Sequence, residues 1–298
     1  MSMPFYVSPE QSMRDKADYA RKGVARSRSS VVVQYSGGIL MVTPNLSSVL
    51  HKISEIYDRI AFAAVGRYNE YEVLRKAGVT YADLTGYQFD RGDVTARGLA
   101  NWYAQALGQN FSEPTGKPYE VEIVVAEVGA KPDGDQIYRI SWDGSVSDEP
   151  GFVAFGGQVD QVAAALKEGF SDGMSLTEAL GAALAALAAP AAAAAAAGTA
   201  AAAGNGAQPE LTAANLEVAI LDRARAHRTF RRLHGPRLEE LIAESRAPAA
   251  TETPETEAPA AEAPAETAAP QTTEKPPVAS TDDPPTGPTT PGDGSPLL

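Results

Sequence analysis

The stretch SSVVVQYSGGILMVT, residues 29–43, decides the fold of this chain. Two runs of apolar, largely β-branched residues flank Gly37 and Gly38. Glycine adopts positive φ at little cost, and β-branched residues pack well on a pleated surface. The pattern is typical of two antiparallel strands joined by a tight turn. We therefore expect a hairpin at the start of a β-rich core.

A charged helix, rather than a chain end, precedes this hairpin. The sequence SPEQ at residues 8–11 supplies a capping side chain, a proline at the first helical position and a glutamine that can close a capping box. The helix is expected to run to about Lys22, where Gly23 ends it. Its apolar side is thin, so we expect it to pack against neighbouring subunits.

A strand, a tight turn and a second strand form the usual opening of an amidohydrolase core of the N-terminal-nucleophile type. Such enzymes expose Thr, Ser or Cys as the first residue of that strand and use its own amine as the base. Here the charged helix stands ahead of Ser29 and Ser30, and nothing before them resembles a processing site. The sequence therefore predicts no catalytic residue. An enzyme matured by cleavage before Ser29 or Ser30 stays an alternative.

The rest of the chain alternates strands with pairs of helices. Apolar patterns predict strands at 59–65, 119–128, 136–142, 152–155, 216–220 and 229–233. Helical spacing predicts helices at 68–77, 93–111, 157–170, from 175 onward and at 236–245. Two helices on each face of an antiparallel pair of sheets would bury every apolar stripe. This arrangement is an α+β fold, a four-layer αββα sandwich.

Particular residues are expected to mark the helix ends. Gly78 should end the helix that begins at 68, and Asp93 should cap the next one. Ser175 and Glu178 form a second capping box. The strand at 216–220 alternates apolar residues with Glu217 and Ala219 and is expected to be half-buried.

The charge of the chain is acidic and unevenly distributed. Of the net charge of −13, nine acidic residues and one lysine beyond residue 246 contribute about −8. We expect no nucleic acid partner, because phosphate binding needs a basic surface. Cysteine is absent, and the histidines lack the spacing of metal ligands, so we expect neither a metal nor a cofactor. The histidines are His51, His227 and His234.

Two segments are of low complexity. Residues 190–209, rich in Ala and Gly, are expected to be a flexible insertion, although alanine favours helix. Residues 247–298 contain Pro, Ala, Thr and Glu but no aromatic residue, and predict a disordered acidic tail that is either inert or tunes the access of partners. No apolar segment of signal-peptide length opens the chain, and Pro190 and two glycines interrupt the alanine run. We expect a cytoplasmic protein with no membrane segment.

Four blocks of sequence resemble one known family. They are SPEQSMRDKADYARKG, LHKISEIYDRIAFAAVGRYNEYEVLRKAG, RGDVTARGLANWYAQALG and KPYEVEIVVAEVG. Over about residues 2–245, apart from the alanine-rich insertion, the sequence is similar to α-type subunits of the bacterial, actinobacterial-type 20S proteasome. The tail beyond Arg246 carries no family signal.

The resemblance implies a homoheptameric ring of αββα subunits. Two such rings would cap two rings of threonine-protease β subunits, in a four-ring core of 28 subunits. The α rings would gate the entry of unfolded protein substrates that carry a small protein tag (Pup), and would dock a ring ATPase or another activator. Hydrolysis would take place in the β chambers. A stand-alone scaffold ring without a protease partner stays a second alternative.

Lys52 is the candidate docking residue that the resemblance implies. In the family, a lysine at this place lies in the pocket between adjacent α subunits and pairs with the terminal carboxylate of an activator's hydrophobic-Tyr-X tail. An ammonium in a cleft suits this task because it makes a charge-assisted hydrogen bond. Arg26 of the neighbouring subunit would add a second cation. A solvated lysine, and a solvated run of Lys22, Arg26 and Arg28, are the alternative interpretations.

The resemblance also implies a gate and a pore annulus. Residues 1–8 would form an arm, and seven such arms could bury their apolar side chains against one another at the ring axis. The chain lacks the Tyr-Asp-Arg turn that archaeal and eukaryotic α subunits carry here, so their gate-opening contacts cannot be carried over. A frayed terminus and an ordinary turn are the alternatives. The gate residues are Met3, Pro4, Phe5, Tyr6, Val7 and Ser8, and the annulus residues are Pro114, Thr115 and Gly116.

Overall fold

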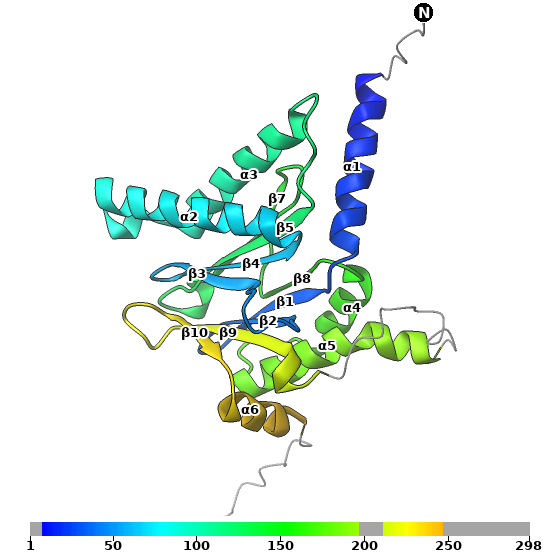
Figure 1. Ribbon diagram of the computed structural model, residues 1–298. Helices are drawn as coiled ribbons and strands as arrows, with labels where there is room; N and C mark the ends of the chain where they lie inside the picture. The colour runs from blue at the N-terminus through cyan, green and yellow to red at the C-terminus, as the bar shows by residue number, and fades with distance from the viewer. Residues whose placement is uncertain (1–7, 197–210, 247–298) are drawn as a thin grey trace, which may run out of the picture. The chain divides into compact units, whose positions relative to one another are not determined.

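The structure is a computed structural model that describes residues 8–196 and 211–246 (Figure 1). The chain divides into two units, residues 1–250 and 251–298. All of the second unit lies outside the described residues. The predicted flexible insertion from residue 197 onward, the predicted disordered tail and five of the six gate residues also lie outside them.

Two antiparallel sheets of five strands each form the centre of the first unit. The first sheet has the strand order β10-β9-β2-β1-β8, and the second has the order β3-β4-β5-β6-β7. The strands of the first sheet are β1 (Ser30–Tyr35), β2 (Gly38–Pro44), β8 (Phe152–Phe155), β9 (Leu216–Asp222) and β10 (Phe230–Leu233). Those of the second are β3 (Ile53–Tyr57), β4 (Ile60–Gly66), β5 (Val121–Glu127), β6 (Gln136–Ile140) and β7 (Val146–Asp148).

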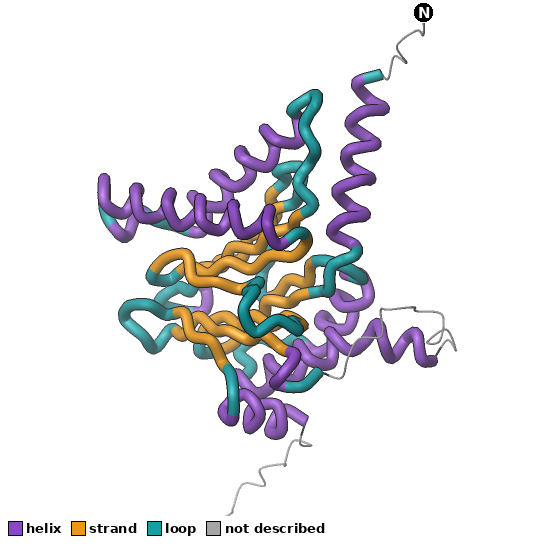
Figure 2. The backbone as a smooth tube through the Cα atoms, in the orientation of Figure 1, coloured by secondary structure: helices purple, strands orange, loops and turns teal. Residues whose placement is uncertain are grey.

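Helices cover the outer face of each sheet, as Figures 1 and 2 show. One buried cluster joins α2 (Tyr68–Gln88) and α3 (Ala96–Ser112) to the second sheet. Another joins α4 (Val159–Gly169), α5 (Leu176–Ala196) and α6 (Pro236–Arg246) to the first sheet. A third cluster lies between the two sheets. The predicted αββα sandwich is therefore confirmed. Short 3₁₀ turns complete the connections, at η1 (Arg91–Asp93), η2 (Pro132–Gly134) and η3 (Ala213–Asn215).

The central strands read as continuous apolar runs because both of their faces are buried. In β1, Val31 and Val33 face the helices, whereas Val32 faces the other sheet. The same holds for β9, where Val218 faces the helices and Ala219 faces the second sheet. The prediction of a half-buried strand at 216–220 is therefore wrong. Ala219 is buried between the sheets, but a small residue between larger apolar ones resembles the solvent-facing position of an alternating strand.

The first helix, α1 (Pro9–Ala25), begins as predicted and ends later. Ser8 caps it by accepting a hydrogen bond from the Gln11 N–H (3.2 Å). Gly23 does not end the helix. A side chain at this position would overlap the buried side chain of Glu120, so glycine is required here for close packing. The last turn then brings Val24 into the cluster between the sheets.

Two other helix boundaries differ from the prediction for similar reasons. α2 passes through Gly78 and ends at Gln88. A side chain at position 78 would overlap the Tyr103 hydroxyl of α3, so close packing, and not a helix end, explains this glycine. Asp93 does not cap α3 but ends η1. Thr95 is the cap, and its hydroxyl accepts from the Gly98 N–H (3.1 Å).

The capping box ahead of α5 is confirmed. The Ser175 N–H donates to the Glu178 carboxylate (2.7 Å), and the Glu178 N–H donates to Ser175 Oγ (3.3 Å). The helix then continues through a buried Pro190 to Ala196. The first part of the expected flexible insertion, residues 190–196, is therefore helical.

Within the described residues, α5 alone is long and apolar enough to cross a membrane by length and composition. A helix of a protein core passes the same test. Leu180, Ala183 and Leu187 of α5 are buried in the cluster beneath the first sheet, so a place in the core accounts for its apolar composition.

Candidate functional site

Lys52 stands where the chain crosses from one sheet to the other. β2 ends in the first sheet at Pro44, residues 45–52 make the crossing, and β3 opens the edge of the second sheet at Ile53. The half-buried Lys52 side chain turns back toward β2, and its Nζ donates to the Pro44 carbonyl (3.0 Å). Two further ammonium protons remain for another acceptor.

The surroundings of Lys52 make its ammonium group lose a proton more readily than that of an exposed lysine. Burial, the largest cause, and the charge of Arg28 lower its pKa from 10.5 to about 8, while the Glu217 carboxylate raises it. The charged form therefore predominates at neutral pH and is lost in mildly alkaline solution. Such a group can bind a carboxylate near neutrality.

Glu217 of β9 is the residue that organises this crossing. Its carboxylate is buried, with 8% of the side chain exposed. One oxygen, Oε2, accepts from the Lys52 N–H (2.9 Å) and from Asn45 Nδ2 (2.8 Å). The other oxygen, Oε1, accepts from the Ile53 N–H (3.2 Å) and pairs with Arg232 Nη1 (2.5 Å). His51 Nδ1 lies 3.3 Å from the same oxygen.

The sequence analysis missed Glu217. It placed this residue on the polar side of an alternating strand, a position at which glutamate is ordinary. The signal that could have found it is an acidic residue inside the strand LEVAILD, whose other residues are apolar as far as Leu221.

A cavity of about 350 Å³ opens beside the crossing. Polar side chains of the crossing and of β10 line it, including Asn45, His51 and Arg232. Two apolar side chains of the crossing face solvent, Leu46 with 65% and Val49 with 76% exposure. The crossing thus combines a half-buried cation with uncovered apolar surface.

Arg26 lies apart from this group within the chain. It occupies the C-cap position of α1 and is exposed. Arg28 is the arginine whose charge acts on Lys52 in the single chain. A contact of Arg26 with the pocket of a neighbouring subunit stays a prediction.

The expected annulus residues form the turn that follows α3. Pro114 and Thr115 are exposed, and the Gly116 N–H donates to the Glu113 carbonyl (3.3 Å). Lys16 of α1 donates to the Phe111 carbonyl (3.3 Å) and also to that of Glu113. Figure 1 accordingly shows α1 beside the connection from α3 to β5. The middle of α1 and the end of α3, from which the turn leads, are therefore joined within one subunit.

Of the expected gate residues, Ser8 lies within the described part of the chain. Its hydroxyl caps α1. Met3, Pro4, Phe5, Tyr6 and Val7 lie outside the described residues.

The position of a catalytic nucleophile is filled by hydrogen-bonded serines inside the chain. Ser30 opens β1 and donates through Oγ to Thr43 Oγ1 (2.6 Å), and Ser29 donates through Oγ to the Gly157 carbonyl. Both serines are buried. Their nitrogens belong to peptide bonds, because the chain continues through Arg28 into α1.

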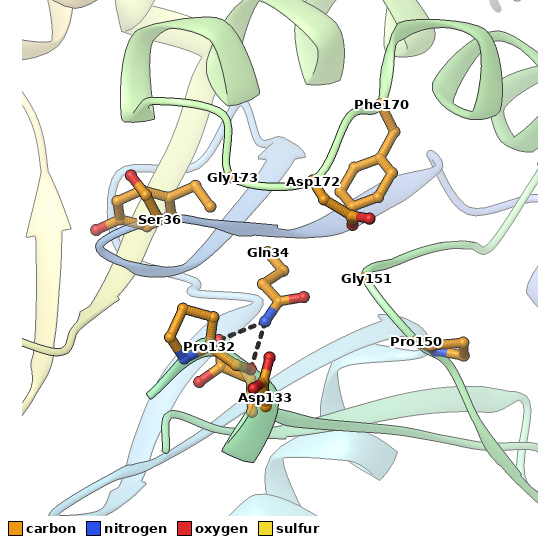
Figure 3. Close-up of a pocket in the computed structure, with 11 residues that line it drawn as sticks. Gln34, Ser36, Pro132, Asp133, Pro150, Gly151, Phe170, Asp172 and Gly173 are labelled. Atoms are coloured by element: carbon orange, nitrogen blue, oxygen red, sulfur yellow. Dashed lines mark hydrogen bonds between the residues drawn. The ribbon is translucent and has the colours of Figure 1, made fainter. Parts of the chain in front are cut away.

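A second cavity, of about 400 Å³, lies at the other end of β1 (Figure 3). Gln34 Nε2 donates across it to the Pro132 carbonyl (2.7 Å) and to Asp135 (2.9 Å). Asp135 is in turn paired with Arg223 (2.8 Å). Asp133 and Asp172 also line the cavity, but no group of residues within the described ranges has the composition of a metal site.

Two antiparallel sheets between helical layers, with β1 at the place of the nucleophile strand, define the N-terminal-nucleophile class of fold. In this chain a helix precedes that strand. Comparisons with known proteins identify the family within this fold class. A family model described as proteasome subunit matches residues 24–203.

Close relatives come from actinobacteria and carry the name proteasome subunit alpha. The protein of Thermomonospora curvata is 62% identical, over 82% of this chain and 99% of its own length. That of Streptosporangium roseum is 62% identical, over 84% and 91%, and that of Thermobifida fusca is 59% identical, over 82% and 92%. The chain therefore belongs to the proteasome subunit family, among its α-type members, as the four sequence blocks predicted.

Proposed function

We propose that this chain is a non-catalytic α subunit of a cytoplasmic proteasome core particle. In this proposal, seven copies form each outer ring, which gates the entry of tagged, unfolded proteins and docks a ring ATPase or another activator. The observation that carries the docking role is that one strand crossing holds both the half-buried Lys52 ammonium and solvent-facing apolar side chains. Threonine-protease β subunits perform the hydrolysis.

The chemistry of the first strand supports the proposed absence of catalysis by this chain. An N-terminal nucleophile needs a free amine as its base, and the nitrogens of Ser29 and Ser30 lie within peptide bonds. The hydroxyl of Ser30 is in addition engaged with Thr43. Intact mass spectrometry of the purified subunit tests this point. Loss of the residues before Ser29 or Ser30 would favour the alternative, a self-processed peptidase.

The docking role rests on the geometry of the Lys52 ammonium. Its Nζ uses one proton on the Pro44 carbonyl and keeps two for an incoming acceptor. The terminal carboxylate of an activator tail would accept a charge-assisted hydrogen bond. Exposed Val49 and Leu46 offer apolar contact to the hydrophobic residue of such a tail.

Lys52→Ala tests the docking role directly. A hydrogen bond between charged groups contributes about 1.5–3 kcal/mol, so the variant should bind an activator tail about 10- to 100-fold more weakly. The measurement is fluorescence anisotropy of a labelled peptide that ends in leucine, tyrosine and alanine, with assembled core particles. Unchanged affinity would overturn the docking role of Lys52.

Gating would act through the link between α1 and the annulus turn. Lys16 ties the two together, and the arm of residues 1–8 leads into α1. Activator tails that bind at the crossing would favour arm conformations that leave the pore open, by differential affinity for the two states. Folded proteins would stay outside.

Assembly with other subunits fits the uncovered apolar side chains of the single chain. Tyr87 and Phe89, at the end of α2, are 90% and 73% exposed. Large exposed aromatic side chains at one place are typical of protein contacts. The acidic net charge of −13 disfavours nucleic acid as a partner.

The experiment that tests the whole proposal uses particles reconstituted with a β subunit. Turnover of peptides and of an unfolded protein is compared between intact particles and particles whose α subunits lack residues 2–8. Faster turnover after truncation is expected, because the arms obstruct the pore. Equal turnover would reduce the arm to a frayed end. Failure to form any active particle would favour the stand-alone scaffold ring.

A further inference from the structure

The backbone at Lys52 is held on both sides by one charged pair. Glu217 accepts from the N–H groups of Lys52 (2.9 Å) and Ile53 (3.2 Å). Arg232 Nη2 donates to the Ile53 carbonyl (2.5 Å), and Arg232 Nη1 pairs with Glu217. The donor and the acceptor of Ile53 are therefore both fixed by the same ion pair. The orientation of the preceding residue, Lys52, is fixed with them.

This ion pair joins the two sheets. Glu217 lies in β9 and Arg232 in β10, two strands of the first sheet, whereas Ile53 opens β3 of the second. Asn45 extends the contact along the crossing, because its Nδ2 reaches both Glu217 (2.8 Å) and the Leu50 carbonyl (2.7 Å). One buried carboxylate thus contacts both ends of the crossing, at Asn45 and at Lys52 and Ile53.

We propose that Glu217 is a positioning residue of the docking site, which fixes the place of the Lys52 ammonium and favours its charged form. The inference rests on the proposed docking function. A carboxylate that merely stabilised the fold would leave the affinity and the pH dependence of docking unchanged.

The charges around Lys52 also affect its protonation state. Arg28 opposes the ammonium form, whereas Glu217 supports it. Arg232 and, when protonated, His51 surround the same carboxylate. Replacing Glu217 with glutamine would leave these cations without their counter-charge. The pKa of Lys52 would then fall below its present value of about 8.

The buried carboxylate Glu122 of β5 is a matched control. It accepts from the Gly156 N–H (2.9 Å) and from Arg139 Nε (2.7 Å), so it also combines a backbone contact with an arginine pair. It lies in β5, whereas Glu217 lies in β9 of the other sheet. Glu122→Gln thus reproduces the loss of a buried ion pair at a place where no docking is proposed.

The experiment measures the affinity of assembled core particles for the labelled peptide ending in leucine, tyrosine and alanine, between about pH 6.5 and pH 9. Glu217→Gln should weaken binding about tenfold at neutral pH, since one carboxylate oxygen becomes an amide nitrogen, so one of the two backbone donors loses its acceptor and Arg232 loses its counter-charge. It should also move the pH at which binding is lost to a lower value. Glu122→Gln should change neither quantity.

Two outcomes overturn the inference, and they differ from the failure of the proposed function. If Lys52→Ala abolishes docking while Glu217→Gln binds as wild type at every pH, Glu217 is not a positioning residue. If Glu217→Gln and Glu122→Gln weaken docking equally, the effect is one of general stability. If Lys52→Ala itself binds normally, the docking function fails, and the inference fails with it.

Asn45→Ala keeps the inference testable if Glu217→Gln does not assemble. This variant removes the amide that joins Glu217 to the Leu50 carbonyl but leaves the carboxylate in place. Binding should weaken about threefold, within the range of one neutral hydrogen bond, with no change in the pH at which it is lost. Wild-type affinity of this variant would contradict the positioning role of the crossing.

Discussion

At the scale of single residues, the proposed docking role would couple proton binding by Lys52 to carboxylate binding. Burial and Arg28 lower its pKa from 10.5 to about 8. The unfolded chain therefore binds more protons than the folded chain between about pH 8 and pH 10.5, and this group makes folding more favourable as the pH rises through that window. Docking has the opposite sign, because a carboxylate needs the ammonium form. Through Lys52, a rise in pH from about 8 to 10.5 therefore favours folding and disfavours the proposed docking.

The prediction is that docking weakens above pH 8 while the fold persists. Affinity for the labelled peptide should fall about tenfold per pH unit once the pH exceeds the Lys52 pKa of about 8. Lys52→Arg is the control, because a guanidinium stays charged throughout and its affinity should remain flat with pH. A wild-type profile that is equally flat to pH 9 would contradict the assignment of Lys52 as the titrating cation.

Lys52 and Glu217 also mark what could be predicted of the site. Lys52 stands in a sequence block that resembles a known family, so its role was expected from the sequence. Glu217 contacts Lys52 across 165 residues of chain, and the local sequence shows an acidic residue in an apolar strand without indicating its partners. A buried carboxylate becomes visible when its donors are assembled from the crossing, β10 and β3. The tertiary contact, rather than the residue type, is the basis of the role that we propose for Glu217.

At the scale of elements, the sequence located most helices and strands but misplaced several ends. Strand and helix cores follow hydrophobic periodicity, which is local. Gly23 and Gly78 look like stop signals, yet both sit inside helices where another chain segment approaches closely. Both edge strands of the second sheet, β3 and β7, escaped prediction, and β7 has three exposed residues and no apolar pattern. The ends of elements depend on contacts that the local sequence does not contain.

Gly78→Ala tests this explanation of the α2 glycine. Alanine is the better helix former by about 1 kcal/mol, so a surface glycine would gain stability on replacement. At this position the new methyl group overlaps the hydroxyl of the buried Tyr103, and overpacking costs about 1–3 kcal/mol. We expect a net loss of stability in denaturant unfolding of the subunit.

Gly108→Ala in α3 is the matched control for this variant. Its methyl group would meet the Asp143 carbonyl at 3.6 Å, an ordinary contact, so this variant should gain up to about 1 kcal/mol. If both variants gained stability alike, Gly78 would be a poor helix residue without a packing role.

At the scale of the whole molecule, the body up to Arg246 and the acidic tail of residues 247–298 contribute different properties. The three buried clusters draw on residues between Val24 and Ile242. The C-terminal helix α6 contributes Leu238, Leu241 and Ile242 to one of them, and Arg246 Nη2 at its end donates to the Leu211 carbonyl (2.7 Å). Residues 247–298 carry about −8 of the net −13. The packing that the structure describes therefore lies in the body, and most of the net charge lies in the tail.

A chain that ends at Arg246 should accordingly unfold at the same temperature as the full chain but associate with other copies more readily. Its net charge falls to about −5, which raises the isoelectric point and weakens the repulsion that keeps copies apart. A chain that ends at Glu240 is the control, because it loses the buried Leu241 and Ile242 and should be destabilised by about 3 kcal/mol or more. Thermal unfolding and isoelectric focusing of the three chains check both expectations. Among the described residues the clusters include no side chain beyond Ile242, so a lowered unfolding temperature for the chain ending at Arg246 would mean that tail residues contact the body.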